Sequence, residues 1–246
     1  MKTLLLNLMG TSPMVATEMY AYLKNEHIND IILLYTSNKY VEAGTMAAKA
    51  SLENNFGVNV HLSKLKFEDI LGRNELIMFI DQLAKIIKTE RENYNIDKII
   101  INVSGGRKIE TIILSIYSSI FGFDEVYNII NKNIQNYNEK YEMIRDKILE
   151  FNGTSNDSEL YKKYQHLIDP IFYPDMNDLY FLRVPVVKLP EDEINKIKTA
   201  LSSTMIEDSE LEDYRLNAYR DSGFITYDKT RIYITELGKI ILDYMK

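Results

Sequence analysis

The regular alternation of short apolar runs with helical patterns constrains the fold of this chain more than any other feature. Through the first 130 residues, a run rich in Leu, Ile or Val is followed several times by a tight connection and an amphipathic segment. The run Lys98–Val103 is mostly β-branched, as expected of a parallel strand that is buried on both faces. The alternation predicts an α/β fold with a doubly wound, mostly parallel sheet of the Rossmann-like type.

The predicted elements of this region follow one another with short connections. The polar segment at 131–170 is expected to add two helices as an insertion, and Tyr180–Val187 to be an edge strand because Pro185 cannot donate a hydrogen bond. Strands are expected at Leu4–Met9, Ile31–Thr36, Val58–Leu62, Lys98–Val103 and Glu125–Ile130, and helices at Met14–Lys24, Tyr40–Asn55, Glu75–Glu92 and Ile109–Phe121.

The last part of the chain shows a different order of elements. Leu189-Pro190 reads as a junction, so we expect one domain at 1–189 and a second at 190–246. Three helices, a hairpin and a closing helix in this order are typical of a winged helix-turn-helix domain. The helices are expected at Glu191–Ser203, Glu207–Asp213, Tyr214–Ser222 and Glu236–Met245, and the hairpin strands at Phe224–Tyr227 and Ile232–Thr235.

Composition narrows the classes of function. The chain has no cysteine, which excludes disulfides, thiolate zinc sites and a cysteine nucleophile. No run approaches the roughly 18 apolar residues of a membrane helix, and the N-terminal apolar run is too short for a signal peptide, so we expect a cytoplasmic protein with no membrane contact. The net charge of −7, from 29 basic and 36 acidic residues, disfavours a protein that coats nucleic acid and leaves room for a local anion pocket.

The first candidate loop is Gly10-Thr11-Ser12-Pro13, between the first strand and the first helix. Gly10 allows a close backbone approach, and Thr11 and Ser12 place hydroxyls where a helix N-terminus presents free amides. Pro13 suits the first helical turn because no donor is lost there. The loop is suited to bind an anion, although Ser or Thr before Pro also opens many helices that bind nothing.

The second candidate loop is Ser104-Gly105-Gly106-Arg107-Lys108, which follows the strand at Lys98–Val103. Two adjacent glycines let the backbone turn sharply and expose its amides to an anion. Arg107 adds a forked donor and Lys108 a point charge, both suited to phosphate. The alternative is a structural turn with two solvated cations.

The two loops strengthen each other, because the carboxyl ends of parallel strands meet at one edge of the sheet, where open α/β sheets bind ligands. Neither loop has the Gly-x-Gly-x-x-Gly spacing of a dinucleotide site or the spacing of a P-loop, so an NAD enzyme is disfavoured. We therefore expect the two loops to hold the phosphates of a small RNA-like ligand.

Taken together, the Gly-Thr-Ser-Pro and Ser-Gly-Gly-Arg-Lys loops on one α/β sheet resemble those of the CRISPR-associated Rossmann fold (CARF) proteins. The resemblance covers residues 1 to about 189, and the trailing winged helix also occurs in several of these proteins. It implies a homodimer that holds a cyclic oligoadenylate, most often cyclic tetra-adenylate, across a two-fold axis. It implies no cofactor and no metal.

The resemblance also bears on activity. The RNase effector of many CARF proteins uses an Arg and a His about five residues apart, and no Arg precedes His27, His61 or His166 at that spacing. The chain therefore looks similar to a self-contained ring nuclease, in which a ribose 2′-hydroxyl attacks its own phosphate. We assign catalysis to Ser12, which with the amide after it would hold the scissile phosphate, and to Lys108, which would stabilise the developing charge. The expected ligand contacts are Gly10, Thr11, Pro13, Ser104, Gly105, Gly106, Arg107, Arg183 and Lys188.

The alternative function is a transcription regulator that responds to the ring and binds DNA through the winged helix. Residues 190–246 carry 8 Lys and Arg against 12 Asp and Glu. The expected recognition helix offers only Arg215 and Arg220 as cations, and the hairpin tip adds Lys229 and Arg231. DNA thus remains possible as a partner, but the acidic balance favours a dimerisation module.

Overall fold

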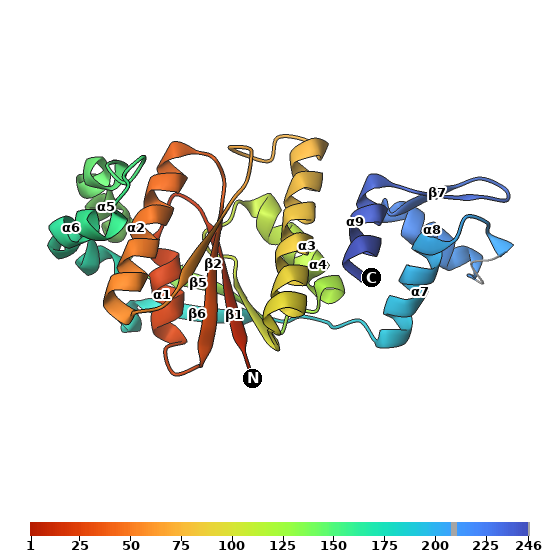
Figure 1. Cartoon of the computed structure of the whole chain (residues 1–246), viewed down its shortest axis with the longest axis horizontal. Coiled ribbons are helices and arrows are strands. Elements are labelled where there is room, and N and C mark those ends of the chain that lie inside the picture. The colour runs from red at the N-terminus through yellow and green to blue at the C-terminus, as the bar shows by residue number, and fades with distance from the viewer. Residues whose placement is uncertain (208–210, 246) are drawn as a thin grey trace.

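A six-stranded sheet forms the centre of the computed structural model, which describes residues 1–207 and 211–245. The strands lie in the order β3-β2-β1-β4-β5-β6, and helices cover both faces (Figure 1). The mostly parallel α/β sheet predicted from the alternating pattern is confirmed. The strands are β1 (Thr3–Met9), β2 (Ile28–Tyr35), β3 (Val60–Lys64), β4 (Lys98–Asn102), β5 (Glu125–Asn131) and β6 (Leu179–Val184), and the helices between them are α1 (Met14–Tyr22), α2 (Lys39–Phe56), α3 (Arg73–Tyr94), α4 (Lys108–Phe121), α5 (Ile134–Leu149) and α6 (Asp157–Phe172).

The strand order changes direction between β1 and β4. From β1 the chain runs outward through β2 to β3, then returns through α3 and continues from β4 to β5 on the other side of β1. Strands β1 to β5 are parallel neighbours, whereas β6 is an antiparallel edge strand on β5. The loops after β1 and β4 therefore diverge to opposite faces of the sheet and leave a crevice at their carboxyl ends.

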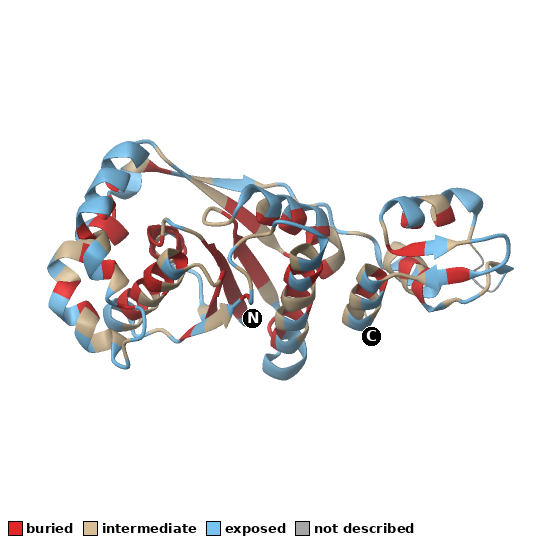
Figure 2. Ribbon diagram, turned by 90° about the horizontal axis from the view of Figure 1, so that it is seen from above, coloured by how far each residue is buried: buried red, intermediate tan, exposed pale blue. Residues whose placement is uncertain are grey.

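Alternate residues of each central strand face opposite layers of helices. Leu4, Leu6 and Leu8 of β1 pack with α3 and α4, whereas Leu5 and Met9 pack with α1 and α2. All five side chains are buried, and the buried residues of the strands lie between the two helical layers in Figure 2. Burial on both faces explains why these strands show continuous apolar runs.

Two helices, α5 and α6, occupy the polar segment at 131–170. Both helices pack on the α1 and α2 side of the sheet, where Phe151, Tyr161 and Phe172 are fully buried. Asn156 caps α6 by accepting from the backbone N–H of Glu159. The insertion thus thickens the layer behind the first candidate loop.

The C-terminal elements lie beyond α3 at the opposite end of the molecule from α5 and α6 (Figure 1). A segment after β6 leads to α7 (Glu191–Ser202), and then come α8 (Asp213–Asp221), the β7–β8 hairpin (Ile225–Tyr227 and Ile232–Ile234) and α9 (Glu236–Met245). Met205 adds an isolated bridge to Arg231. The expected helix at Glu207–Asp213 lies partly outside the described residues, and Leu211 and Glu212 precede α8 without helical structure. Two helices, α7 and α8, precede the hairpin in the described part of this region, and its assignment as a winged helix stays a prediction.

Length and polarity rule out a membrane-spanning role for every helix that the structure describes, since none combines enough residues with enough apolar character.

Candidate functional site

The two candidate loops meet in a cavity of about 280 Å³ at the carboxyl ends of β1 and β4. The cavity lies where the strand order reverses, as expected of ligand sites in open α/β sheets. Additional lining comes from the β2–α2 connection and from the first turn of α4. The lining residues are Met9, Gly10, Thr11, Ser12, Thr36, Asn38, Val41, Ser104, Gly105, Gly106, Arg107 and Glu110.

Close packing of the two loops requires glycine. A Cβ atom on Gly10 would lie 2.0 Å from the carbonyl oxygen of Gly105, and one on Gly105 would lie 2.2 Å from the carbonyl oxygen of Leu8. Real Cβ atoms do not approach backbone atoms so closely. The glycines predicted to allow a close approach therefore bring the two loops into contact, and this contact shapes the cavity.

Ser104 holds the second loop in place through a buried hydrogen-bond network. Its hydroxyl donates to Oδ1 of Asn102 at 2.5 Å and accepts from the backbone N–H of Ile129 at 2.7 Å. Asn102 in turn donates to Oδ1 of Asn7 and to the carbonyl oxygen of Val15, both at 2.9 Å. The network ties β4 and β5 to β1 and α1. The Ser104 hydroxyl thus positions the loop, while the contact of Ser104 with a ligand stays a prediction, and the residue lines the cavity.

The first loop presents polar groups that the protein leaves unused. Among the described residues, none forms a hydrogen bond with the hydroxyl of Thr11 or Ser12. Pro13 stands at the N-cap of α1 and packs against Gly44 of α2 instead of lining the cavity. Because Pro13 has no N–H, the amide after Ser12 cannot donate to a phosphate, which corrects that part of the assignment. The two hydroxyls remain free to bind a ligand.

The two cations of the second loop differ in their surroundings. Arg107 lines the cavity at the N-cap of α4, and its Nη2 lies 3.3 Å from Oδ2 of Asp69. Lys108 is exposed in the first turn of α4, outside the lining, and has no ion-pair partner in the described part of the chain. Arg107 is thus partly neutralised, whereas Lys108 is exposed next to a lining residue.

Glu110 is a lining residue that the sequence analysis did not identify. It is 3% exposed, and its Oε2 accepts from the backbone N–H of Arg107 at 2.7 Å. Burial raises the pKa of its carboxyl, as does the nearby Asp69, while Arg107 acts in the opposite direction. The only signal in the sequence was the spacing, since a Glu three residues after an N-cap is typical of a capping box.

Glu18 is a second buried carboxyl, on α1, the helix that follows the first candidate loop. It is 2% exposed, its Oε1 has no hydrogen-bond partner, and burial raises the pKa of the carboxyl to about 7. Nδ2 of Asn7 on the neighbouring β1 also lacks a partner. The sequence analysis regarded Glu18 as structural, and its absence from the cavity lining agrees with that interpretation.

Arg183 and Lys188 do not join the other predicted residues. Arg183 pairs in register with Tyr127 near the amino end of β5, because β6 runs antiparallel to its neighbour. Its Nη2 lies 3.6 Å from Oε1 of Glu125, and Nζ of Lys188 lies 2.6 Å from Oδ1 of Asp124. Both cations therefore lie at the edge of the sheet opposite the cavity. The expectation that they reach the ligand is corrected by the direction of β6.

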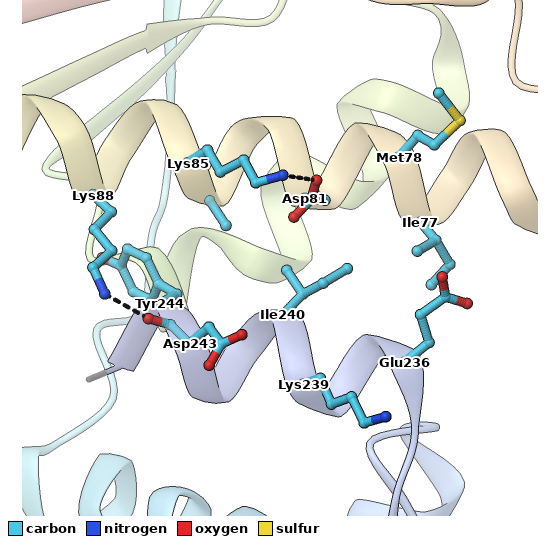
Figure 3. Close-up of a pocket in the computed structure, with 11 residues that line it drawn as sticks. Ile77, Met78, Asp81, Lys85, Lys88, Glu236, Lys239, Ile240, Asp243 and Tyr244 are labelled. Atoms are coloured by element: carbon cyan, nitrogen blue, oxygen red, sulfur yellow. Dashed lines mark hydrogen bonds and ion pairs between the residues drawn. The ribbon is translucent and has the colours of Figure 1, made fainter.

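A larger cavity of about 440 Å³ separates α3 from α9 (Figure 3). Ile77, Met78, Ile240 and Tyr244 contribute apolar surface to it. Two of the lining lysines have partners, because Lys85 contacts Asp81 at 2.5 Å and Lys88 donates to the carbonyl oxygen of Asp243 at 2.7 Å (Figure 3). We regard this cavity as part of the packing contact between α3 and α9, which we call the α3–α9 joint, and the smaller cavity as the candidate site.

The described residues contain no group of three or more His, Asp or Glu side chains placed to hold a metal ion. The donors at the candidate site are hydroxyls, backbone amides and cations, which suit an anionic ligand. The chemistry available there is thus phosphate binding and charge stabilisation.

Solved structures show distant similarity to this chain. Csm6 of Enterococcus italicus, bound to cyclic hexa-2′-fluoro-hexa-dAMP, is 13% identical over 99% of this chain and 76% of its own, with a TM-score of 0.42. Can2 of Sulfobacillus thermosulfidooxidans, in complex with cyclic tetra-adenylate, is 10% identical over 99% of this chain, with a TM-score of 0.34, and the match spans 64% of Can2. N,N′-diacetylchitobiose deacetylase of Pyrococcus horikoshii is 9% identical over 78% of this chain and 88% of its own, also with a TM-score of 0.34. Similarity this distant does not establish a shared ligand or activity.

Sequence comparison is more informative. A comparison with curated proteins found no match. The model of one protein family, described as CRISPR-associated protein NE0113, matches residues 12–215, which is most of the chain and includes Ser12 and the whole second loop. The chain therefore belongs to the CRISPR-associated NE0113 family.

Proposed function

We propose that this protein is a cytoplasmic ring nuclease of the CARF type, which binds cyclic oligoadenylate, most simply cyclic tetra-adenylate, and cleaves it to switch off a CRISPR signal. The observation that carries the proposal is the meeting of the Gly10–Pro13 and Ser104–Lys108 loops at one cavity. Membership of a CRISPR-associated family and the cyclic oligonucleotides named for Csm6 and Can2 agree with this ligand.

A homodimer would complete the site. Ile109, Ile112 and Ile116 form an apolar stripe along α4 and are 37%, 52% and 63% exposed. The stripe begins two residues after Arg107, at the mouth of the cavity. A second copy packed on it would bury these side chains and bring two cavities together about a two-fold axis, as a symmetric ring requires. Each chain would then supply half of the phosphate contacts.

The proposed reaction uses the ring's own ribose. The 2′-oxygen forms a bond to the adjacent phosphorus while the bond from phosphorus to the 5′-oxygen breaks. The proton of the hydroxyl ends on the 5′-oxygen, and the product carries a 2′,3′-cyclic phosphate. The protein's contribution is to hold the hydroxyl in line and to stabilise charge on the phosphate. The alignment can contribute several kcal/mol, a part of the about 7–11 kcal/mol that well-oriented intramolecular reactions gain over bimolecular ones. Ser12 is suited to the first task and Lys108 to the second.

The regulator hypothesis rests on the C-terminal hairpin and helices. Both cations of α8 are already engaged, because Arg215 contacts Glu193 at 2.5 and 3.0 Å and Arg220 contacts Asp221 at 2.9 Å. Phosphate contacts by either arginine would require these pairs to break. The pairing favours the enzyme over the regulator, with the C-terminal elements as a dimerisation module.

Incubation of the purified protein with cyclic tetra-adenylate in EDTA tests the enzymatic proposal. We expect linear products with 2′,3′-cyclic phosphate ends, because the nucleophile belongs to the ligand. An intact ring after prolonged incubation with excess protein would exclude cleavage and leave binding alone. A gel shift with the protein's own promoter DNA, with and without the ring, tests the regulator, which predicts a ring-dependent shift.

The dimer is tested separately by Ile112→Asp, which places a charge in the stripe. We expect a monomer by analytical ultracentrifugation and ring affinity at least tenfold weaker. Leu182→Asp is the matched control, since Leu182 is 49% exposed on the edge strand β6, away from the stripe. A dimer that survives Ile112→Asp would show that the stripe is not the interface.

A further inference from the structure

The buried carboxylate of Glu110 stands out in a cavity otherwise suited to anions. It lines the cavity together with Thr11, Ser12 and Arg107, and it is 3% exposed. A negative group in this position repels phosphate, so a carboxylate here must have another role in the site. The carboxylate lies directly against the glycine loop, because a Cβ atom on Gly106 would lie 3.3 Å from Oε2 of Glu110.

Capping of α4 accounts for only one of the two carboxylate oxygens. Oε2 accepts from the backbone N–H of Arg107 at 2.7 Å, whereas none of the described residues donates to Oε1. A glutamine at this position would cap the helix equally well, because its amide oxygen can accept the same hydrogen bond. The cap therefore does not explain the charge, and Oε1 remains available to a donor that enters the cavity.

The hydrogen-bond donors of the proposed ligand limit which of its groups can donate to Oε1 of Glu110. An adenylate ring offers the ribose 2′-hydroxyl and the exocyclic amine of the base, and the ribose is bonded directly to the phosphate. A carboxylate in the same wall as the phosphate-binding groups therefore meets the sugar before the base. A ribose hydroxyl is also the group that distinguishes RNA from DNA. Resting on the proposed function, we infer that Glu110 is the specificity-determining residue that accepts a hydrogen bond from a ribose 2′-hydroxyl and so selects a ribonucleotide ring.

Two charged groups, Arg107 and Asp69, act on the carboxylate of Glu110. Arg107 belongs to the same loop, and Asp69 reaches the site from the connection before α3, where it pairs with Arg107. Neutralisation of Asp69 changes the field over the whole cavity, whereas Glu110→Gln also replaces the free acceptor oxygen with an NH2 group, since the one amide oxygen stays on the cap. Glu110→Gln and Asp69→Asn therefore form a matched pair of variants, because each removes one negative charge and nearly preserves the shape.

The experiment compares cyclic tetra-adenylate with its all-2′-deoxy counterpart. Stopped-flow binding of rings that carry one 2-aminopurine yields dissociation constants in the first seconds, before cleavage products accumulate. We expect the wild type to prefer the ribose ring at least tenfold, and Glu110→Gln to reduce that preference below threefold while it binds the deoxy ring as tightly as the wild type or more so. Asp69→Asn should change both affinities together and keep the wild-type ratio.

The outcomes distinguish a failure of the proposed function from a failure of the role assigned to Glu110. A wild type that binds neither ring contradicts the proposed function, and the role of Glu110 fails with it. A wild type that binds both rings equally, or a Glu110→Gln variant that keeps the wild-type ratio, overturns the role of Glu110 while ring binding stands. If Glu110→Gln does not fold, Glu110→Asp, which keeps the charge but withdraws it from the cavity, is expected to lose the same preference, and an unchanged ratio would overturn the inference.

Discussion

The loop cavity at the carboxyl ends of β1 and β4 and the cavity between α3 and α9 differ in volume and in the groups that line them. The first is about 280 Å³, and backbone, hydroxyl groups and an N-cap arginine form its wall. The second is about 440 Å³ and lies between two helices, with apolar side chains and with Lys85 and Lys88, which have acidic or carbonyl partners. The larger cavity is thus part of a helix packing contact, whereas the smaller one is formed by loops at strand ends.

Position at the strand ends and the hydroxyls without partners among the described residues, and not volume, are therefore our criteria for the candidate site. Within residues 1–207 and 211–245, the free hydroxyls of Thr11 and Ser12 and the unpaired Lys108 lie at one edge of the sheet, whereas Lys85 and Lys88 of the α3–α9 cavity have partners. The following predictions test this distinction.

The largest effect is expected from Gly105→Ala. Its Cβ would lie 2.2 Å from the carbonyl oxygen of Leu8, so the two loops must separate. We expect ring affinity to fall more than a hundredfold, with about 1–3 kcal/mol lost in unfolding free energy from overpacking. Titration calorimetry and urea denaturation measure the two. Gly72→Ala is the control, because its Cβ has only a side-chain oxygen of Glu75 at 3.4 Å, and it should leave ring affinity unchanged.

Glu18→Gln tests the buried acid of α1. Burial raises the pKa of Glu18 from 4.5 to about 7, so the folded state is penalised as pH rises from 4.5 to 7, and the full penalty remains above 7. The glutamine variant should be more stable than wild type by up to about 3 kcal/mol at pH 8 and equally stable below pH 4.5. Urea denaturation across this range checks the slope. The exposed Glu139→Gln should show no such pH-dependent gain, and a Glu18→Gln gain independent of pH would contradict the explanation.

Lys108→Ala tests the free cation of the site. We expect cleavage of cyclic tetra-adenylate to slow more than tenfold, because the charge that develops on the phosphate loses its counter-ion. Ser12→Ala should also slow it. Single-turnover assays measure both rates. Lys239→Ala, which removes a lysine from the α3–α9 cavity, should not change the rate. Unchanged rates for both site variants would show that the catalytic assignment is misplaced.

The smallest effect is expected from Tyr244→Phe in the α3–α9 joint. The Tyr244 hydroxyl donates to the carbonyl oxygen of Phe121 at 2.9 Å, and the two rings meet edge to face at 4.8 Å. Loss of the hydrogen bond should cost about 1 kcal/mol of stability, while the ring contact remains. Thermal unfolding measures the loss. Ring affinity should stay at the wild-type value, and a change of more than threefold would show that the joint communicates with the site.

Much of the fold and the main site followed from local patterns. The central strands were predictable because a sheet covered on both faces needs continuous apolar runs, and their parallel direction brings the loops at Gly10 and Gly105 to one edge. The direction of β6 was not predictable, since a single strand pattern does not reveal its partner's orientation. Arg183 and Lys188 were therefore wrongly expected to reach the ligand.

Other features depend on contacts between distant segments. Asp69 lies in the connection before α3 and reaches Arg107 only in the folded chain, so the partial neutralisation of that arginine carried no signal. The hydroxyl of Ser104 is occupied by Asn102 and Ile129, one of which is on another strand. The role of Pro13, in contrast, could have been recognised from its chemistry alone, because proline has no N–H to offer a phosphate.

Titration of cyclic tetra-adenylate into the purified protein tests the central claim most directly, with a linear tetra-adenylate as the competing ligand. The account predicts saturable binding of one ring per two chains, at least a hundredfold tighter than the linear molecule, and loss of that binding in Gly105→Ala. A ring that binds no better than the linear molecule, or that binds Gly105→Ala as tightly as wild type, would contradict the claim that the two loops hold it.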